Sequence, residues 1–503
     1  MNFNEYKYLD LPKISEEILS YWEKNEIFKK SVSKTSGKNP YIFFEGPPSA
    51  NGLPGIHHVL ARSIKDIFLR FKTMKGFYVQ RKAGWDTHGL PVELGVENSL
   101  GITKEDIGKK ISVEDYNEEC KKAVMKYTDI WNDLTLKMGY WVDVNNPYVT
   151  YTPKYMESVW WLLKQIYDKE LMYKGYTIQP YSPKAGTAIS SHELNQPGTY
   201  QDVSDTTVTA QFKLLNKNLP DFLNSDTDIF VIAWTTTPWT LPSNTALTVG
   251  PKIKYSLIRS FNQYTGIKAD YIVAEDLISK QFSNVYYESD NLQDLAEYEF
   301  NAKKIPFVKI NSFLGKELEN IKYEQLIDYA VPYENPKDAF RIILGDFVTT
   351  TDGTGIVHTA PTFGADDALV AKSAKPPVPP MLVKDSNGDL VPLVDLQGKF
   401  RPEMRELAGK FVKNEYYEKD NTPEKSVDVE IAIKLKTENK AFKVEKYKHS
   451  YPNCWRTDKP ILYYPIDSWF IKATSFRDKM VSLNKKINWK PKSTGEGRFE
   501  KWL

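Results

Sequence analysis

Cysteine is nearly absent from this sequence, which has two in 503 residues, Cys120 and Cys454. They lie far apart in the chain, and nothing in their placement indicates a disulfide framework, so a reducing compartment is expected. Long apolar runs are also absent: no stretch approaches the roughly 18 apolar residues that a membrane-spanning helix needs. Residues 1–28 lack the segments of a signal peptide. We therefore expect a cytoplasmic protein with no membrane partner.

A strong charge of either sign is missing as well, because the net charge is only +2. This balance neither requires nor forbids a nucleic-acid partner, since a local basic face can coexist with an acidic one. A composition of 41% hydrophobic and 26% charged residues is ordinary for a globular protein and argues against disorder. The length exceeds what one core supports and predicts two to four domains.

Histidine is scarce too, with six in the chain, and two of them, His57 and His58, are adjacent. They stand in "FEGPPSANGLPGIHHVLARSIKDIFLRFKTMKG", residues 44–76, between a Pro- and Gly-rich loop and an amphipathic segment. The other four lie in stretches that are dense in Gly, Pro, Asp or Trp: His88, His192, His358 and His449. These contexts favour sites over routine surface positions.

The N-terminal part has the pattern of an α/β fold. Residues 10–30 predict a helix capped by Ser15, residues 40–44 a buried strand, and residues 57–75 a helix whose apolar face turns inward. That face consists of Leu60, Ile64, Ile67, Phe68 and Phe71. A second strand at 76–83 completes the start of a Rossmann-like parallel sheet, in which ligands bind at the carboxyl ends of the strands.

The predicted secondary structure changes along the chain. Residues 112–145 and 153–173 predict helices, whereas short β-rich runs begin near residue 200 and indicate a barrel-like domain. A Pro-rich connection occupies 374–392, and apolar strand-like segments return near 446. We expect a helical arm at 1–39, the first part of a catalytic domain at 40–199, a β-rich domain at 200–445, and a return to the catalytic domain at 446–503.

The start of the helix after residue 56 suits a phosphate group. Its unpaired backbone N–H groups and partial positive charge attract anions, and two imidazoles add hydrogen-bond donors. His57 and His58 could stabilise the charge that builds on a triphosphate when a carboxylate attacks its α-phosphorus. The alternative is that one histidine packs against the following strand.

This stretch resembles the nucleotide-binding signature of class I aminoacyl-tRNA synthetases, in which four residues usually read His, any apolar residue, Gly, His. Here they read Gly55, Ile56, His57, His58, so the first histidine and the glycine have exchanged places. Since the glycine normally admits the adenine, either His57 turns away or Gly55 provides that opening. The flanking "EGPPSANGLP" and "GWDTHGLPVE" resemble isoleucyl-tRNA synthetases in particular.

The resemblance implies roles for the residues around this signature. Asp86 would hold the ammonium group of the amino acid through a charge-assisted bond beside Trp85. His88 and Pro47 would shape the pocket, and Gly55 with the two histidines would meet ATP, which enters with Mg²⁺ as a substrate. The alternative for Asp86 is a helix-capping carboxylate.

Two further segments resemble the halves of the editing site of isoleucyl-tRNA synthetases, which hydrolyses valine wrongly attached to the tRNA for isoleucine. They are "WTTTPWTLPSNTA", 234–246, and "GTGIVHTAPTFGADD", 353–367. Valine lacks one methylene of isoleucine, and such a difference changes the binding free energy by only about 1–3 kcal/mol, for which this pair is the standard example. A second site that hydrolyses the wrong product is therefore needed. By resemblance, Asp367 holds the ammonium group, and the terminal adenosine and ester are lined by Thr235, Thr236, Thr237, Asn244 and His358.

Other readings of these segments stay open. The threonines could form an edge strand, the Asp366–Asp367 pair could cap a helix, and His358 could be satisfied in a core. We predict His57, His58, His358 and Asp367 as catalytic residues, although no general base for editing is evident and the substrate's own hydroxyl could serve.

Two family features are absent. Relatives often hold zinc with paired cysteines, but Ser182, Ala185 and Thr457 occupy three of the four positions and leave Cys454 alone, so no zinc is expected. The second class I signature, a Lys-Met-Ser-Lys-Ser loop, is also missing. We therefore expect a truncated chain that retains the editing fold and charges tRNA poorly or not at all.

The leading interpretation is a monomeric isoleucine-tRNA ligase with editing activity, whose partners are isoleucine, ATP and the tRNA for isoleucine. One alternative is a stand-alone hydrolase of mischarged tRNA, which would not depend on ATP. Another is a tRNA-binding module without chemistry. Valyl-type specificity is disfavoured by "GWDTHGLP".

Overall fold

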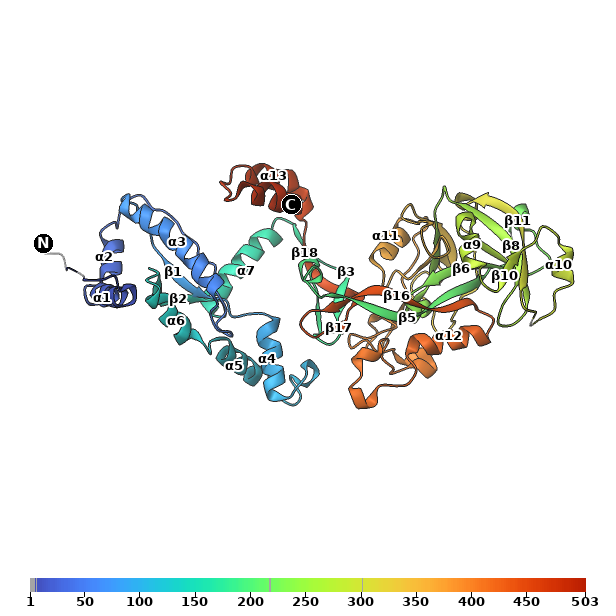
Figure 1. Cartoon of the computed structure of the whole chain (residues 1–503), viewed down its shortest axis with the longest axis horizontal. Helices are drawn as coiled ribbons and strands as arrows, with labels where there is room; N and C mark the ends of the chain where they lie inside the picture. The colour runs from blue at the N-terminus through green and yellow to red at the C-terminus, as the bar shows by residue number, and fades with distance from the viewer. Residues whose placement is uncertain (1–4, 6, 217–218, 301) are drawn as a thin grey trace. The chain divides into compact units, whose positions relative to one another are not determined.

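A computed structural model describes residues 5, 7–216, 219–300 and 302–503 (Figure 1). The chain forms two compact units. The first unit comprises Met1–Tyr173 with Ile471–Leu503, and the second unit comprises Lys174–Phe470. The first and last parts of the chain therefore belong to one unit, into which the second is inserted.

The first unit is mainly helical around a short parallel pair of strands. Its strands are β1 (Lys82–Trp85) and β2 (Asp143–Val149), which pair in parallel. Its helices are α1 (Leu11–Lys24), α2 (Ile27–Ser33), α3 (Ile56–Met74), α4 (Leu90–Leu100), α5 (Val113–Val124), α6 (Thr128–Lys137), α7 (Pro153–Tyr167), α13 (Arg477–Asn484) and α14 (Glu500–Trp502).

The N-terminal helix starts earlier than its predicted cap. The side chain of Asp10 accepts a hydrogen bond from the Lys13 N–H at 3.2 Å, and α1 begins at the next residue, Leu11. The predicted cap, Ser15, lies inside α1, so that prediction is wrong. Asp10 satisfies an amide that has no partner within the helix, which is the usual reason for Asp at this position.

The predicted strand at 40–44 is also wrong. Its ladder contact is a single parallel bridge between Pro40 and Tyr78, and the side chains of Ile42 and Phe44 are 72% and 88% exposed. The strand predicted at 76–83 is likewise reduced to that bridge and the start of β1. The apolar sequence predicted a buried strand, whereas the side chains of Ile42 and Phe44 are exposed in their unit.

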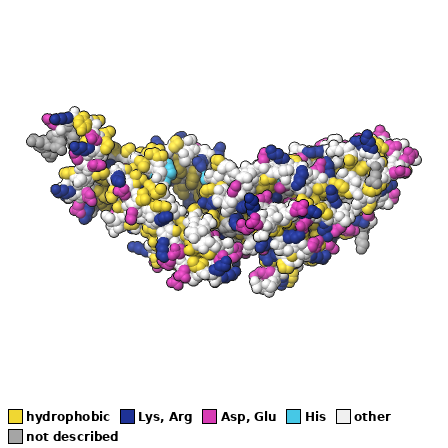
Figure 2. All heavy atoms as spheres, turned by 60° about the horizontal axis from the view of Figure 1, so that its bottom comes forward, with side chains coloured by type: hydrophobic (Ala, Val, Ile, Leu, Met, Phe, Trp, Pro, Cys, Tyr) yellow, Lys and Arg dark blue, Asp and Glu magenta, His cyan; other side chains and the backbone are white. Residues whose placement is uncertain are grey.

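Helix α3 has the predicted extent, but its apolar face is not turned inward. The five residues of that face are between 50% and 66% exposed: Leu60, Ile64, Ile67, Phe68 and Phe71. Figure 2 shows hydrophobic side chains gathered on the surface of the first unit.

The buried face of α3 is made by Leu69 together with polar groups. Arg62 donates to Thr135 at 2.9 Å, and Asp66 lies 3.6 Å from the guanidinium of Arg81. Polar pairing, rather than the apolar face, therefore fixes how α3 packs within its unit.

The second unit is built on an eleven-stranded sheet. Its path runs β10-β11-β8-β9-β6-β13-β7-β12, while β5 pairs with β6 and β16, and β16 also pairs with β17. The strands are β5 (Tyr200–Lys213), β6 (Ile229–Thr235), β7 (Ala246–Val249), β8 (Lys254–Phe261), β9 (Lys268–Ala274), β10 (Tyr286–Glu288), β11 (Ile305–Leu314), β12 (Arg341–Leu344), β13 (Ile356–Thr359), β16 (Ala441–Cys454) and β17 (Lys459–Pro460).

Smaller elements surround this sheet. One three-stranded sheet has the order β18-β3-β4, and β14 pairs with β15. These strands are β3 (Met172–Ser182), β4 (Thr187–Ala188), β14 (Leu382–Lys384), β15 (Leu390–Pro392) and β18 (Leu462–Ile471). The helices are α8 (Ser191–Leu194), α9 (Ile278–Gln281), α10 (Gln293–Ala296), α11 (Ala365–Ser373) and α12 (Val427–Thr437). The second unit is rich in β-structure, but its strands begin with β3, before the change predicted near residue 200.

Strand β6 lies at the centre of the core because its sequence, "IFVIAWT", is apolar on both faces. A strand buried on both sides has a continuous apolar run instead of alternation, and β-branched and aromatic residues suit it. Its neighbour β13 pairs with it in parallel and with β7 in antiparallel fashion. This arrangement brings the ends of β6 and β13 together at one place.

Among the described residues, no helix combines the length and the apolar character that crossing a bilayer requires.

A buried ion pair in the sheet gives a stability test. The carboxylate of Asp270, which is fully buried, accepts from Arg259 Nε at 2.7 Å, from Arg259 Nη2 at 2.9 Å and from Ser225 at 2.6 Å. Removing Asp270 leaves the largely buried guanidinium of Arg259 with the exposed Asp226, 2.7 Å away, as its carboxylate partner, so Asp270→Ala should lower the free energy of unfolding by about 3 kcal/mol in urea denaturation.

The exposed pair of Asp202 and Lys448, 3.0 Å apart across β5 and β16, is the matched control. Asp202→Ala should cost less than about 1 kcal/mol, because solvent screens both charges. Equal losses in the two variants would contradict the assignment of Asp270 to a buried pair.

Candidate functional site

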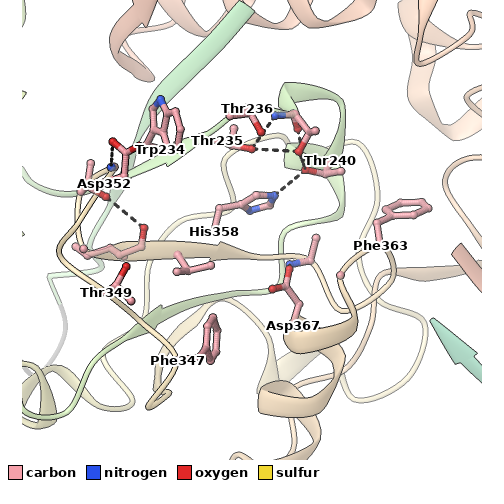
Figure 3. Close-up of a pocket in the computed structure, with 18 residues that line it drawn as sticks. Trp234, Thr235, Thr236, Thr240, Phe347, Thr349, Asp352, His358, Phe363 and Asp367 are labelled. Carbon is pink, nitrogen blue, oxygen red and sulfur yellow. Dashed lines mark hydrogen bonds between the residues drawn. The ribbon is translucent and has the colours of Figure 1, made fainter. Parts of the chain in front are cut away.

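A cavity of about 410 Å³ in the second unit gathers hydroxyl, imidazole and carboxylate side chains (Figure 3). We call it the threonine pocket. It is lined by Trp234, Thr235, Thr236, Thr237, Thr240, Phe347, Thr349, Asp352, Gly353, Thr354, Gly355, Ile356, Val357, His358, Ala360, Phe363, Gly364 and Asp367. Both segments that the sequence analysis paired therefore contribute to one cavity.

Five of the six predicted pocket residues line this cavity: Thr235, Thr236, Thr237, His358 and Asp367. In Figure 3 Thr235, Thr236 and Thr240 gather on one side of His358, and Asp367 stands at the start of α11. The sixth residue, Asn244, is buried behind His358 and does not line the cavity. It contacts the histidine instead of a ligand.

The threonines are held by a network that starts where β6 ends. The hydroxyl of Thr235 accepts from the Thr237 N–H at 3.1 Å and lies 3.3 Å from the Thr237 hydroxyl. The Thr240 hydroxyl donates to the Thr237 carbonyl oxygen at 2.8 Å. The chain between them enters a buried 3₁₀ helix, η3 (Pro238–Ser243). The turn therefore presents several hydroxyl groups in fixed positions.

Hydrogen bonds on both ring nitrogens set the tautomer of His358. Asn244 Nδ2 donates to the Ala246 carbonyl at 2.8 Å, so this atom is the amide nitrogen, and it also lies 2.9 Å from His358 Nδ1. Nδ1 must then accept, which leaves the proton on Nε2, 3.1 Å from the Thr240 hydroxyl. Tyr323 completes the chain by donating to Asn244 Oδ1 at 2.6 Å.

His358 is therefore neutral and fully engaged. Burial lowers its pKa to about 4, since the charged form is disfavoured away from water. With Nδ1 occupied by an amide donor and Nε2 by a hydroxyl, neither nitrogen offers a free lone pair to the cavity. The geometry suits a residue that orients Thr240 better than one that removes a proton.

Asp367 is the pocket carboxylate that has no cationic partner among the described residues. Its Oδ2 accepts from the Ala360 N–H at 2.8 Å. Burial raises its pKa to about 6, and the neighbouring charge of Asp366 acts in the same direction. The other carboxylate of the lining, Asp352, pairs with Lys280, which lowers its pKa. Asp367 is thus an anion poised to meet a cation.

The close approach of Gly364 makes room for this carboxyl group. A Cβ atom built at residue 364 would lie 2.6 Å from Cγ and Oδ2 of Asp367. The backbone φ of Gly364 is −122°, which any residue can adopt. The glycine is therefore required for space and not for its conformation.

Sequence reasoning missed several lining residues, namely Thr240, Phe347, Thr349, Asp352 and Phe363. Thr240 lies inside the quoted segment 234–246, so its hydroxyl was a visible signal. Phe347 and Thr349 precede the second segment and have no motif of their own. Their position follows from the loop that leads into β13.

The first predicted site lies in the first unit, at the start of α3. His58 Nδ1 accepts from the Gly55 N–H at 2.9 Å, and burial lowers the pKa of His58, an effect that His57 and Arg62 reinforce. The exposed His57 lies against Gly55, where an added Cβ would meet its Cε1 at 2.9 Å. The His57 ring therefore covers the side of Gly55 from which a side chain would project.

Trp131, which the sequence analysis did not single out, connects these residues. The His58 ring meets its edge at 4.7 Å, Trp85 lies at 6.5 Å, and the guanidinium of Arg62 stands 4.9 Å from its ring centre. A tryptophan in an ordinary helical pattern gave no signal of this role.

The remaining predicted residues of the first site lie in the loop before α3 and in the segment that follows β1. Asp86 follows β1 with its N–H bonded to the Pro48 carbonyl at 3.0 Å and its side chain exposed. His88 Nδ1 lies 3.2 Å from the Thr150 hydroxyl. Pro47 is half-buried in the loop before α3.

The segments around Ser182 and Cys454, where zinc ligands were considered and not expected, are turns closed by hydrogen bonds. Ser182 Oγ accepts from the Ala185 N–H at 3.2 Å, and the Cys454 carbonyl accepts from the Thr457 and Asp458 N–H groups at 3.1 and 2.8 Å. In the part of the chain that the structure describes, no group of three or more His, Cys, Asp or Glu side chains could hold a metal ion.

The tautomer of His358 can be tested by one substitution. Asn244→Asp replaces the donor opposite Nδ1 with a buried carboxylate oxygen, which favours a proton on that nitrogen. The pKa of His358 should then rise from about 4 to above about 6 in a ¹⁵N NMR titration. Asn244→Ala, which adds no charge, should leave it low. A histidine still neutral at pH 6 in the Asp variant would contradict the assigned network.

Comparison with known proteins gives a consistent answer. Isoleucine–tRNA ligases from Bacteroides fragilis and Cytophaga hutchinsonii are each 56% identical over 100% of this chain, which covers 44% and 45% of those proteins. The isoleucine–tRNA ligase of Clostridium tetani is 41% identical over 99% of this chain and 42% of that protein. The chain thus spans less than half the length of these relatives.

A solved structure named "The crystal structure of GlLeuRS-CP1" matches 48% of this chain and 99% of that chain, at 14% identity and a TM-score of 0.30, a similarity too weak to support an argument. The model of the family "tRNA synthetases class I (I, L, M and V)" matches residues 17–503. With nearly its whole length matched by that model, the chain belongs to the class I tRNA synthetases.

Proposed function

We propose that the second unit hydrolyses valine wrongly attached to the tRNA for isoleucine, and that the whole protein is an isoleucine-tRNA ligase. The observation that carries the editing proposal is the threonine pocket, where an unpaired carboxylate faces several hydroxyl groups. A pocket of this kind suits a ligand that has an ammonium group at one end and a ribose at the other.

The proposed chemistry is hydrolysis of an ester. Water attacks the carbonyl carbon, the bond from that carbon to the ribose oxygen breaks, and a proton passes to the leaving ribose oxygen. Asp367 would bind the ammonium group, and Thr235, Thr236 and Thr237 would hold the ribose and the water. Since both nitrogens of His358 are engaged, we assign the relay of the proton, from the attacking water to the leaving ribose oxygen, to the neighbouring ribose hydroxyl.

Synthesis belongs to the proposal for the longer protein. Isoleucine, ATP with Mg²⁺ and the tRNA for isoleucine would be its substrates, and Gly55, His57 and His58 would meet the ATP while Asp86 holds the amino acid. His58 offers one donor, because Nδ1 is occupied by the Gly55 N–H and the proton therefore lies on Nε2. A monomeric state, a cytoplasmic location and a barrel-like closure of the second unit are parts of this proposal.

Substitution of the pocket carboxylate tests the editing proposal. Asp367→Ala should lower kcat/KM for valyl-tRNA hydrolysis by about 10- to 100-fold, because a hydrogen bond to a charged group contributes about 1.5–3 kcal/mol. The assay would follow release of labelled valine by the 503-residue chain, with isoleucyl-tRNA as the comparison substrate.

Asp366 provides the matched control for that assay. It is the adjacent residue of α11, is exposed and does not line the pocket, so Asp366→Ala should stay within about twofold of the wild type. Hydrolysis that is unaffected by Asp367→Ala would overturn the proposed role. Binding of tRNA without any hydrolysis would favour the module without chemistry.

The raised pKa of Asp367 predicts a pH dependence. As the pH falls through about 6 the carboxylate takes up a proton and loses its attraction for ammonium, so kcat/KM should decline by up to tenfold per pH unit between pH 6 and 5. Asp367→Asn should be slow and nearly independent of pH over this range. A wild-type profile that stays flat from pH 7 to 5, after subtraction of spontaneous hydrolysis, would argue against an ionised Asp367.

The zinc content of the purified protein tests the expectation that no zinc binds near Cys454. With Ser182, Ala185 and Thr457 in place of ligands, the purified chain should contain less than about 0.1 zinc per molecule by mass spectrometry, because a structural site requires four donors. A variant with cysteine at these three positions is the comparison. Stoichiometric zinc in the wild type would refute this prediction.

A further inference from the structure

A cluster of ionisable side chains, two of them buried and two half-buried, lies beside the threonine pocket without lining it. Lys413 Nζ lies 3.2 Å from Asp205 Oδ2 and 3.8 Å from Asp428 Oδ2, and His449 Nε2 lies 3.2 Å from the same Asp205 oxygen. We call these four residues the charged cluster. They come from β5, the segment before α12, α12 itself and β16.

Burying the charged cluster costs free energy, because its ions lose hydration. Lys413 and Asp428 are 6% and 4% exposed, and the ammonium group stands 4.7 Å from the ring centre of Tyr451. Attraction between buried ions often does no more than offset their lost hydration, and apolar residues of similar volume frequently serve stability as well. Stability alone therefore does not explain why charges occupy this place.

Asp428 connects the charged cluster to the pocket. Its Oδ1 accepts from the Trp239 N–H at 2.9 Å, and Trp239 lies in η3 between the pocket residues Thr237 and Thr240. The first amides of a 3₁₀ helix have no partner within it, and Pro238 has no N–H to offer. Asp428 thus caps η3 from another element, 189 positions away in the sequence.

The capping residue is itself held in place. Asp428 stands in the first turn of α12, whose N-cap Ser426 accepts from the Val429 N–H at 3.4 Å, and the partial positive charge of this helix end favours a carboxylate. Burial raises the pKa of Asp428 to about 6, while Lys413 and the Trp239 amide oppose that rise. Near neutral pH the carboxylate is ionised and faces Lys413 on one side and η3 on the other.

The position of η3 determines the position of the pocket hydroxyls. Thr240 lies in η3, where its hydroxyl accepts a hydrogen bond from His358 Nε2 and donates one to the carbonyl of Thr237. A shift of the Trp239 backbone would therefore move both threonines relative to Asp367, which is fixed on a different helix, α11. Misplacing a reacting group by about 1 Å can cost on the order of 100-fold in rate.

We propose that Asp428 is a positioning residue for the threonine pocket, fixing the Thr237–Thr240 turn through the Trp239 amide, and that Lys413 orients its carboxylate against the β5–β16 ribbon. The inference rests on the proposed editing function and deepens it. It predicts that the charged cluster controls the rate of ester hydrolysis and leaves the binding of the ammonium group to Asp367.

The test compares Asp428→Ala with Asp428→Asn in the 503-residue chain. The Ala variant leaves the Trp239 amide without an acceptor, so kcat for valyl-tRNA hydrolysis should fall by about 10- to 100-fold while KM stays within about twofold. The Asn variant keeps an acceptor of the same size and should recover kcat to within about fivefold of the wild type. Lys413→Met should fall between the two, because it removes the group that orients the carboxylate.

A buried ion pair elsewhere in the second unit is the matched control. Asp270→Asn disrupts the pair with Arg259, has no bond to η3, and should lower the denaturation midpoint without changing the kcat of the folded protein. The positioning role is overturned if Asp428→Ala retains kcat within twofold. It is also overturned if Asp270→Asn loses kcat to the same extent as Asp428→Ala.

A second measurement keeps this inference separate from the editing proposal. Hydrogen exchange of the Trp239 amide should accelerate by at least about 100-fold in Asp428→Ala and stay slow in Asp428→Asn. If the wild type does not hydrolyse valyl-tRNA, the editing proposal fails, and the exchange experiment still decides whether Asp428 fixes η3. Unchanged exchange in the Ala variant would overturn the positioning role whatever the activity.

Discussion

The backbone pairing of β13 is the interaction on which the candidate site depends. In this short strand Val357 stands opposite Trp234 of β6 and Thr248 of β7. The residue after Val357 is His358 and the residue after Trp234 is Thr235, so one register places the imidazole beside the threonine turn across 118 positions of sequence. A shift by one residue would turn His358 to the other face of the sheet. The hydroxyl network, the tautomer of the histidine and the wall of the threonine pocket all follow from this register.

The sequence predicted five of the side chains that line the pocket, but it did not predict which side chains stand behind them. The threonines and Asp367 stood in segments long enough to be paired by resemblance, and the structure brings them to one cavity. Asn244 stood in the same segment, yet its place behind His358 depends on which way a side chain turns after η3, and no spacing reveals that. Asp428 carried no signal at all, because its contact with the Trp239 backbone joins elements that only the folded chain brings together.

The fold shows the same limit. The period of α3 correctly predicted a helix, but an apolar stripe states only that a partner is favourable and does not say that the partner lies in the same unit. Here Arg62 and Asp66 face the unit while Ile67 and Phe68 remain exposed. The strand at 40–44 failed for a related reason, since Ile42 and Phe44 have the propensity of a strand but only one bridge to a neighbour. Propensity is a local property, whereas pairing requires an available edge.

At Gly364 the backbone conformation would allow any residue, whereas the space beside Asp367 allows only glycine. Its backbone angles are open to any residue, so the sheet and α11 would form equally well around an alanine, and only the carboxyl group of Asp367 lacks room. Under the proposed editing function, a methyl group at residue 364 would therefore act on the binding of the ammonium group by Asp367 and not on the fold. Under that proposal, such a change would pass a measurement of folding and would appear only in a measurement of ester hydrolysis.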